Sequence, residues 1–131
     1  MILILLAAVS LCDAEEVQSG VGLRACYGRL AEQAGRDVAV QFALTLAQMR
    51  RDDVETRRDK VNRADMVPGL MASQRAWLRY RGAECNMVAD QASGGNGGPA
   101  ELGALCLLDL NRQLTADLKR RADEHLYPPA P

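Results

Sequence analysis

Two cysteines stand at nearly equal distances from a glycine-rich segment, and this spacing constrains the fold of the chain more than any other feature. Glycine makes regular structure costly in backbone entropy, so residues 93–99 are predicted to form a loop. Cys85 precedes the loop by about eight residues and Cys106 follows it by about seven. At roughly 1.5 Å per residue, both lie at the same height in an antiparallel helical hairpin. Small residues nearby, Ala89 and Gly103, permit the close approach that a disulfide requires, and we predict a Cys85–Cys106 bridge.

Apolar residues recur at helical spacing along most of the chain, which predicts an all-α fold, a small disulfide-stapled bundle of about four helices. In the second of these helices the expected apolar stripe is widened by three further residues. The stripe comprises Val38, Phe42, Thr45 and Met49, with Val40, Leu44 and Leu46 beside it. The four predicted helices cover about residues 22–34, 37–65, 70–92 and 100–124.

Helix-ending and helix-capping residues place the expected boundaries. Gly35 is positioned to end the first helix, and Asp37 is positioned to cap the second. Pro68 follows the second helix and suits the first turn of the third. Charged residues of both signs dominate residues 50–65. At two places in this segment an acidic residue stands four residues before an arginine. These are expected to be exposed ion pairs on one helix face: Asp53 with Arg57, and Asp59 with Arg63.

The composition limits the classes of partner. A chain of 131 residues is sufficient for one domain, and 48% apolar with 25% charged residues is typical of a globular protein. The 16 Lys and Arg nearly balance the 17 Asp and Glu. This balance gives a weak long-range field, so a nucleic acid is not expected as a partner.

Residues 1–14 resemble an apolar secretory leader, followed by a single helical domain at 15–127 and a proline-rich tail at 128–131. The apolar run is too short to span a bilayer, and it lacks the usual preceding basic residues. The leader is therefore either atypical or starts inside a longer one. Cleavage after Ser10 or Ala14 fits the small residues there. A buried N-terminal helix of a cytosolic protein is the alternative, but four cysteines in a short chain favour a periplasmic or secreted location.

Cys12 has three alternative fates. It pairs with Cys26 if the leader is removed before it, or it is lost with a longer leader. Lipid attachment at Cys12, the one route by which we expect membrane association, is disfavoured because Leu11 occupies a position where Gly, Ala or Ser is usual.

Catalytic and metal chemistry have little support in the sequence. The four cysteines do not form C-x-x-C pairs, so neither a metal site nor a cofactor is expected. The single histidine, His125, stands near the end of the chain, where it cannot be assumed to reach a thiol. We therefore expect a protein that is not an enzyme.

The residues from 74 to 85 form the densest pattern in the chain. On a helix, Trp77, Arg81 and Cys85 share one line, and Tyr80 with Glu84 forms the next. Arg81 can stack on Trp77 or reach Glu84. One interpretation is a clamp that holds the third helix to the core, and the other is a recognition patch. The candidate binding set adds the loop residues Gly94, Gly95, Asn96, Gly97 and Gly98, for which a plain hairpin connector is the alternative.

Three segments together resemble a known family, the LprI-type lysozyme-inhibitor N-terminal domain, formerly a domain of unknown function. They are Gln-Arg-Ala-Trp-Leu-x-Tyr-Arg-x-Ala-Glu-Cys at 74–85, the glycine-rich loop at 94–98, and the segment from Cys106 to Leu118. The chain departs from the usual pattern at Gly82, Asn111 and Leu114, where the family has Asp, Thr and Arg.

This resemblance implies an exported bacterial helical protein and attaches lysozyme inhibition to the family. The resulting hypothesis is a periplasmic or secreted binding protein whose partner is another protein, most specifically a lysozyme-like muramidase, bound through the loop and the Trp77/Arg81 region. The alternative is a non-enzymatic structural or protein-interaction module of the envelope with no lysozyme target.

Overall fold

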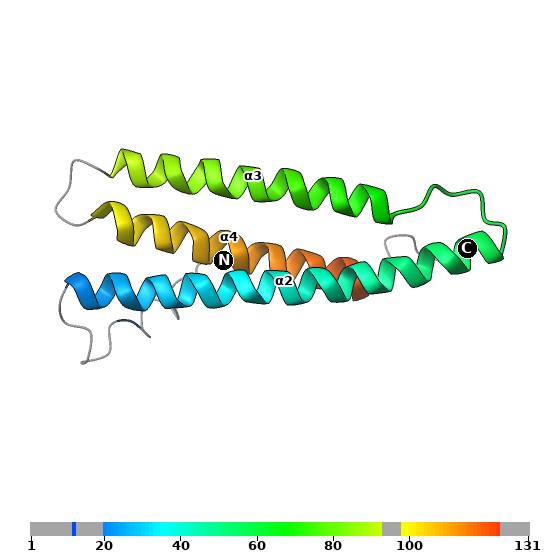
Figure 1. Cartoon of the computed structure of the whole chain (residues 1–131), viewed down its shortest axis with the longest axis horizontal. Helices are drawn as coiled ribbons and strands as arrows, with labels where there is room; N and C mark the ends of the chain where they lie inside the picture. Colours follow the sequence, from blue (N-terminus) through cyan, green and yellow to red (C-terminus); the bar gives the residue numbers. More distant parts are fainter. Residues whose placement is uncertain (1–11, 13–19, 93–97, 124–131) are drawn as a thin grey trace.

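The computed structural model describes residue 12 and residues 20–92 and 98–123, which contain three helices and no strand. These are α2 (Gly20–Arg58), α3 (Val67–Gln91) and α4 (Gly98–Asp123). Figure 1 shows α2 as the longest, with α4 running in the same direction and α3 returning antiparallel to both. The all-α fold with an antiparallel hairpin in the C-terminal half is confirmed.

One continuous helix replaces the first two predicted helices. α2 passes through Gly35 without a break, and Asp37 accepts a hydrogen bond from Gln33 Nε2 (2.9 Å) instead of capping a new helix. A Cβ at Gly35 would lie 3.7 Å from Nδ2 of Asn111 on α4, so helix α4 packs directly over this glycine. The predicted break is therefore wrong, because packing against α4 outweighs the roughly 1 kcal/mol that glycine costs inside a helix.

α2 ends at Arg58, earlier than the predicted end near residue 65. Lys60 adopts a positive φ of 55°, the left-handed conformation that stops a helix. The Val61 amide donates to the Thr56 carbonyl (3.0 Å) and the Lys60 amide donates to the Arg57 carbonyl (3.2 Å). This is the hydrogen-bond pattern of a Schellman cap, and it turns the chain towards α3.

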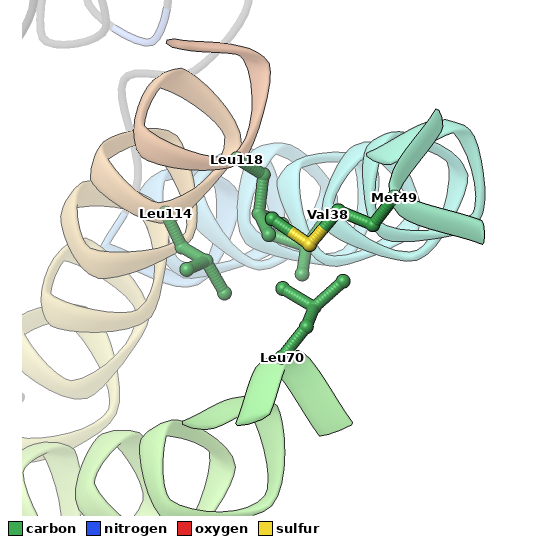
Figure 2. Close-up of a cluster of buried hydrophobic side chains, with 5 residues drawn as sticks. All are labelled: Val38, Met49, Leu70, Leu114 and Leu118. Carbon is green, nitrogen blue, oxygen red and sulfur yellow. The ribbon is translucent and has the colours of Figure 1, made fainter. Parts of the chain in front are cut away.

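The larger core cluster lies where all three helices meet. Val38 and Met49 come from α2, Leu70 from α3, and Leu114 and Leu118 from α4, and all are at least 93% buried. Their side chains converge in Figure 2. The predicted stripe on α2 lies in this region, with Thr45 buried and its hydroxyl donating to the Leu118 carbonyl (2.9 Å).

The predicted widening of the α2 stripe is partly wrong. Leu46 packs against the core cluster, but Val40 and Leu44 are 62% and 59% exposed. They lie on the side of α2 opposite Val38, so residues 38–49 are apolar on the face that no other described helix covers. No helix in the described ranges is long and apolar enough to cross a membrane.

The two predicted helix-face ion pairs are also wrong. Asp53 is 97% buried, and its carboxylate accepts hydrogen bonds from the amides of Met66 and Val67 at the start of α3 (2.8–3.0 Å). Arg63 reaches the same carboxylate at 3.5 Å. Arg57 instead pairs with Asp65 (3.4 Å). Asp53 and Arg57 both lie on α2, but each pairs with a residue beyond the end of that helix, and Asp59 and Arg63 both follow its last residue.

Candidate functional site

The hairpin of α3 and α4 is closed by the predicted bridge. Cys85 and Cys106 form a disulfide with Cα atoms 5.5 Å apart. A Cβ placed at Gly103 would lie 3.5 Å from that of Ala89, so these two small residues sit at the close contact between the helices. A second disulfide joins Cys12 to Cys26 on α2, with Cα atoms 5.7 Å apart, and Cys12 is fully buried. The staple fixes the position of α3 relative to α4 near the loop.

Arg81 and Trp77 form a clamp between α3 and α4. The Arg81 Nη1 group donates to Oδ1 of Asn111 (2.9 Å), and its Cζ atom lies 5.3 Å from the centroid of the Trp77 ring. Trp77 packs against the larger core cluster, and Asn111 is 97% buried. A charged donor on a buried amide oxygen and a cation–π contact both stabilise this interface. These two side chains therefore point inward, towards α4.

The outward side of α3 carries a different set of residues. Tyr80 is 52% exposed, and Glu84 stands one turn further along with a half-buried side chain. The other large apolar residues exposed on this helix are Met71, Leu78 and Met87. Of the predicted binding residues on α3, Tyr80 is thus the one most open to a partner.

Most residues of the predicted binding loop lie outside the part of the chain that the structure describes. Gly94, Gly95, Asn96 and Gly97 lie outside the described residues, as do His125, the proline-rich tail and the predicted leader apart from Cys12. Gly98 is the first residue of α4. The described ends of the two helices, Gln91 and Gly98, lie at the end of the hairpin nearer to the disulfide.

Two shallow hollows flank the hairpin. One of about 300 Å³ lies beside the staple and is lined by small residues of all three helices, among them Gly28, Gly82 and Gly103. A larger one of about 480 Å³ lies at the opposite end, between Met49, Leu70 and Arg121. Neither hollow is lined by Trp77, Tyr80, Arg81 or Glu84, the predicted binding residues of α3.

The described surface of α3 offers exposed side chains that a partner could contact. In residues 12, 20–92 and 98–123 no group of three or more His, Cys, Asp or Glu side chains is placed to hold a metal ion. Both cysteine pairs are oxidised. What the site offers a partner is an exposed helix face carrying aromatic, methionine and arginine side chains, the residue types enriched at protein interfaces.

Sequence reasoning missed two polar residues that hold the site in place. Asn111 follows Leu108 and precedes Leu114 at three-residue steps, so its position within an apolar stripe was a usable signal. Asp53 had a weaker signal. The residue before α3, Met66, makes no side-chain cap, which means that the free amides of this helix need an acceptor from elsewhere. Only the fold identifies Asp53 as that acceptor.

Comparison with known proteins adds a family. A family model described as lysozyme inhibitor LprI matches residues 12–118. An uncharacterized protein of Rhizobium meliloti (strain 1021) is 29% identical over 107 residues, which cover 82% of this chain and 76% of that protein. No solved structure matches significantly. The matched range includes both disulfides and the Trp77–Arg81–Asn111 clamp.

Proposed function

We propose, from the premise that this chain belongs to the lysozyme inhibitor LprI family, that it is an exported bacterial protein that binds and inhibits a lysozyme-like muramidase. Family membership carries the proposal. The exposed face of α3 supports it, because Tyr80 and its apolar neighbours offer a partner the side chains that dominate binding energy in protein interfaces.

An oxidising location outside the cytoplasm fits the two disulfides. The Cys12–Cys26 bridge bears on how the leader is processed. Cleavage after Ser10 keeps Cys12 in the mature protein, whereas cleavage after Ala14 removes it. A sulfur already bonded to Cys26 is also not available for a lipid. We therefore favour a periplasmic or secreted protein cut before Cys12, which keeps this cysteine in the mature chain ahead of the helical domain at 15–127.

The proposed contact surface lies at the stapled end of the hairpin. Trp77 and Arg81 act as positioning residues, because they hold α3 against α4 through Asn111. Tyr80 and Glu84 contact the partner beside the loop at 94–98. This arrangement needs no catalytic group, and the proposed activity is occlusion of an enzyme by a bound protein.

The direct test is a turbidity assay of cell-wall lysis by lysozyme with the purified, oxidised protein added. We expect micromolar protein to slow lysis, and Tyr80→Ala to weaken the effect about tenfold. Leu44→Ala, which removes an equally exposed side chain from α2, serves as the matched control and should inhibit like the wild type. Unchanged lysis at a large molar excess of wild-type protein would remove the proposal.

A second candidate function rests on a separate observation. Val40 and Leu44 leave an apolar face of α2 uncovered, which fits an envelope interaction module without an enzyme target. In that case Val40→Asp/Leu44→Asp would abolish capture of an envelope protein, while lysozyme activity would be unaffected by the wild-type chain.

A further inference from the structure

Two arginines stand four residues apart on the outer face of α3. Arg75 and Arg79 are both exposed, and the helical repeat places them on the side opposite Leu70 and Arg81, which face the core and α4. No acidic residue occurs between Asp65 and Glu84. The two positive charges are therefore neighbours on a stretch of helix that supplies nothing to balance them.

This pair differs from three other exposed arginines, each of which lies beside an acidic residue. Arg57 lies 3.4 Å from Asp65, Arg58 lies 3.6 Å from Asp59, and Arg120 lies 3.4 Å from Asp117. Within the described ranges, Arg75 and Arg79 make no ion pair or hydrogen bond. Like charges at this spacing disfavour the helix by a few tenths of a kcal/mol. The pair therefore adds nothing to the stability of the isolated fold.

The surroundings of the pair suit a protein surface. Met71 stands four residues before Arg75 and Leu78 stands three residues after it, so both flank Arg75 on the helix, with exposed fractions of 36% and 40%. Tyr80, which is 52% exposed, lies on the opposite flank of α3. Small residues, Ala76 and Gly82, occupy neighbouring positions and leave both guanidinium groups accessible. Arginine and methionine are residue types enriched at protein interfaces, and here they stand beside an exposed leucine.

The spacing of the pair fits the catalytic chemistry of the proposed partner. Retaining glycosidases, of which lysozyme is one, place two catalytic carboxyl groups about 5–5.5 Å apart. Residues four apart on a helix have Cβ atoms about 5–6 Å apart, and the flexible arginine side chains let the two guanidinium groups reach carboxylates at that spacing. Each guanidinium can bind a carboxylate through two parallel hydrogen bonds. The geometry points to Arg75 and Arg79 as the residues that bind the two catalytic carboxylates of the muramidase, an inference that rests on the proposed function.

Charge complementarity favours this partner over two others. A second copy packed through α3 about a two-fold axis would place Arg75 of one chain beside Arg79 of the other, and the like charges would repel. An anionic membrane is bound by clusters of about four to eight basic residues, and this face carries two. An enzyme cleft with two carboxylates matches both the number and the sign of the charges.

The test compares four proteins for lysozyme binding by calorimetry and for inhibition of lysis: the wild type, Arg75→Ala/Arg79→Ala, Arg75→Lys/Arg79→Lys and Arg24→Ala/Arg29→Ala. We expect the α3 double alanine variant to bind about a hundredfold more weakly. The lysine variant should lose about tenfold, because lysine keeps the charge but not the two-bond geometry. Arg24 and Arg29 are exposed on α2, and replacing them changes the net charge equally, so this control should stay within about twofold.

A second arm uses lysozyme with its two catalytic carboxylates replaced by amides. The wild-type inhibitor should bind this enzyme about a hundredfold more weakly, and the α3 double alanine variant should show little further change, since both substitutions remove the same contact. Wild-type binding with an unaffected α3 double variant would overturn the role of the arginines while leaving the proposed function intact. No wild-type binding at all would reject both.

The remaining outcomes also decide the question. Concentration-dependent dimers that the α3 double alanine variant abolishes would assign the face to a second copy. Binding of vesicles containing anionic lipid, lost in the same variant, would assign it to a membrane. Either result, obtained without lysozyme binding that depends on the arginines, would overturn the inference.

Discussion

Helix α3 and the pair formed by α2 and α4 are held in the same bundle by different means. α2 contributes buried residues from Tyr27 through Met49 to Asp53, and α4 contributes Leu108, Asn111, Leu114 and Leu118. α3 contributes Leu70 and Cys85 as its buried residues. It is attached instead at three points: the Asp53 carboxylate at its start, Arg81 on Asn111 in its middle, and the disulfide near its end.

The two helices that stabilise the fold are therefore different from the helix that carries the exposed surface. Most of the buried apolar residues that stabilise the fold come from α2 and α4. A helix held at a few points can leave most of its surface exposed, and α3 exposes Met71, Leu78, Tyr80 and Met87. The attachment fixes where that surface stands without covering it, which is the property that a binding face requires.

The largest expected difference is between a core leucine and an exposed one. Leu118→Ala should lower the free energy of unfolding by about 3–4 kcal/mol, because the side chain is 99% buried between α2 and α4. Leu78→Ala on α3 should cost less than about 1 kcal/mol. Urea unfolding followed by circular dichroism measures both. Equal losses would show that α3 is packed as firmly as the other two helices.

Removing the staple should affect α3 selectively. Cys85→Ser/Cys106→Ser should lower the free energy of unfolding by about 3 kcal/mol, since the bridge spans a separation of 21 residues. Amide exchange should accelerate in the second half of α3 while α2 keeps its protection. Cys12→Ser/Cys26→Ser removes the other disulfide and should leave α3 unchanged. Uniform loss of protection along all three helices would contradict local attachment.

Removing the Asp53 carboxylate should cause the next largest loss of stability. Asp53→Ala leaves the Met66 and Val67 amides and Arg63 without their shared acceptor and should cost about 2 kcal/mol. The start of α3 should then exchange faster. Asp59→Ala provides the control, because this carboxylate is exposed and pairs only with Arg58, so its loss should cost less than about 0.5 kcal/mol. An equally small loss in Asp53→Ala would show that the Asp53 carboxylate does not stabilise the start of α3.

The smallest effects are expected from glycines inside the helices. A Cβ at Gly82 would meet nothing within 4 Å, and at Gly35 it would make an ordinary contact with Asn111. Gly82→Ala and Gly35→Ala should therefore each raise the free energy of unfolding by up to about 1 kcal/mol. Thermal melts can resolve this difference. A loss of stability in Gly35→Ala alone would indicate that α2 and α4 pack too tightly at Gly35 to accept a methyl group.

The sequence predicted features that depend on spacing along the chain and missed those that depend on contacts between helices. Local spacing was enough for the hairpin and for its staple, because both depend on distances along the chain from one loop. It was not enough for the length of α2, since Gly35 normally ends helices and only contact with Asn111 of α4 explains why it does not here. Asp53 was assigned to a helix-face pair for the same reason: its partners lie 13 and 14 residues away, across a turn.

The sequence could place the candidate residues on one helix but could not predict their orientation. Residues 74–85 were identified from their density of aromatic and charged side chains, yet the pattern could not tell which of them face α4. The structure turns Trp77 and Arg81 inward and leaves Tyr80 outward. Arg75 and Arg79 attracted no notice in the sequence, because their unbalanced charge matters only once they are known to be exposed on one face.

Amide hydrogen exchange of the oxidised protein, alone and with saturating lysozyme, tests most directly whether α3 is the presented binding surface. We predict slower exchange across residues 71–87 of α3 in the complex, with exchange rates unchanged in α2 and in the second half of α4. Slower exchange confined to α2 around Val40 and Leu44, or no change in any helix, would contradict it.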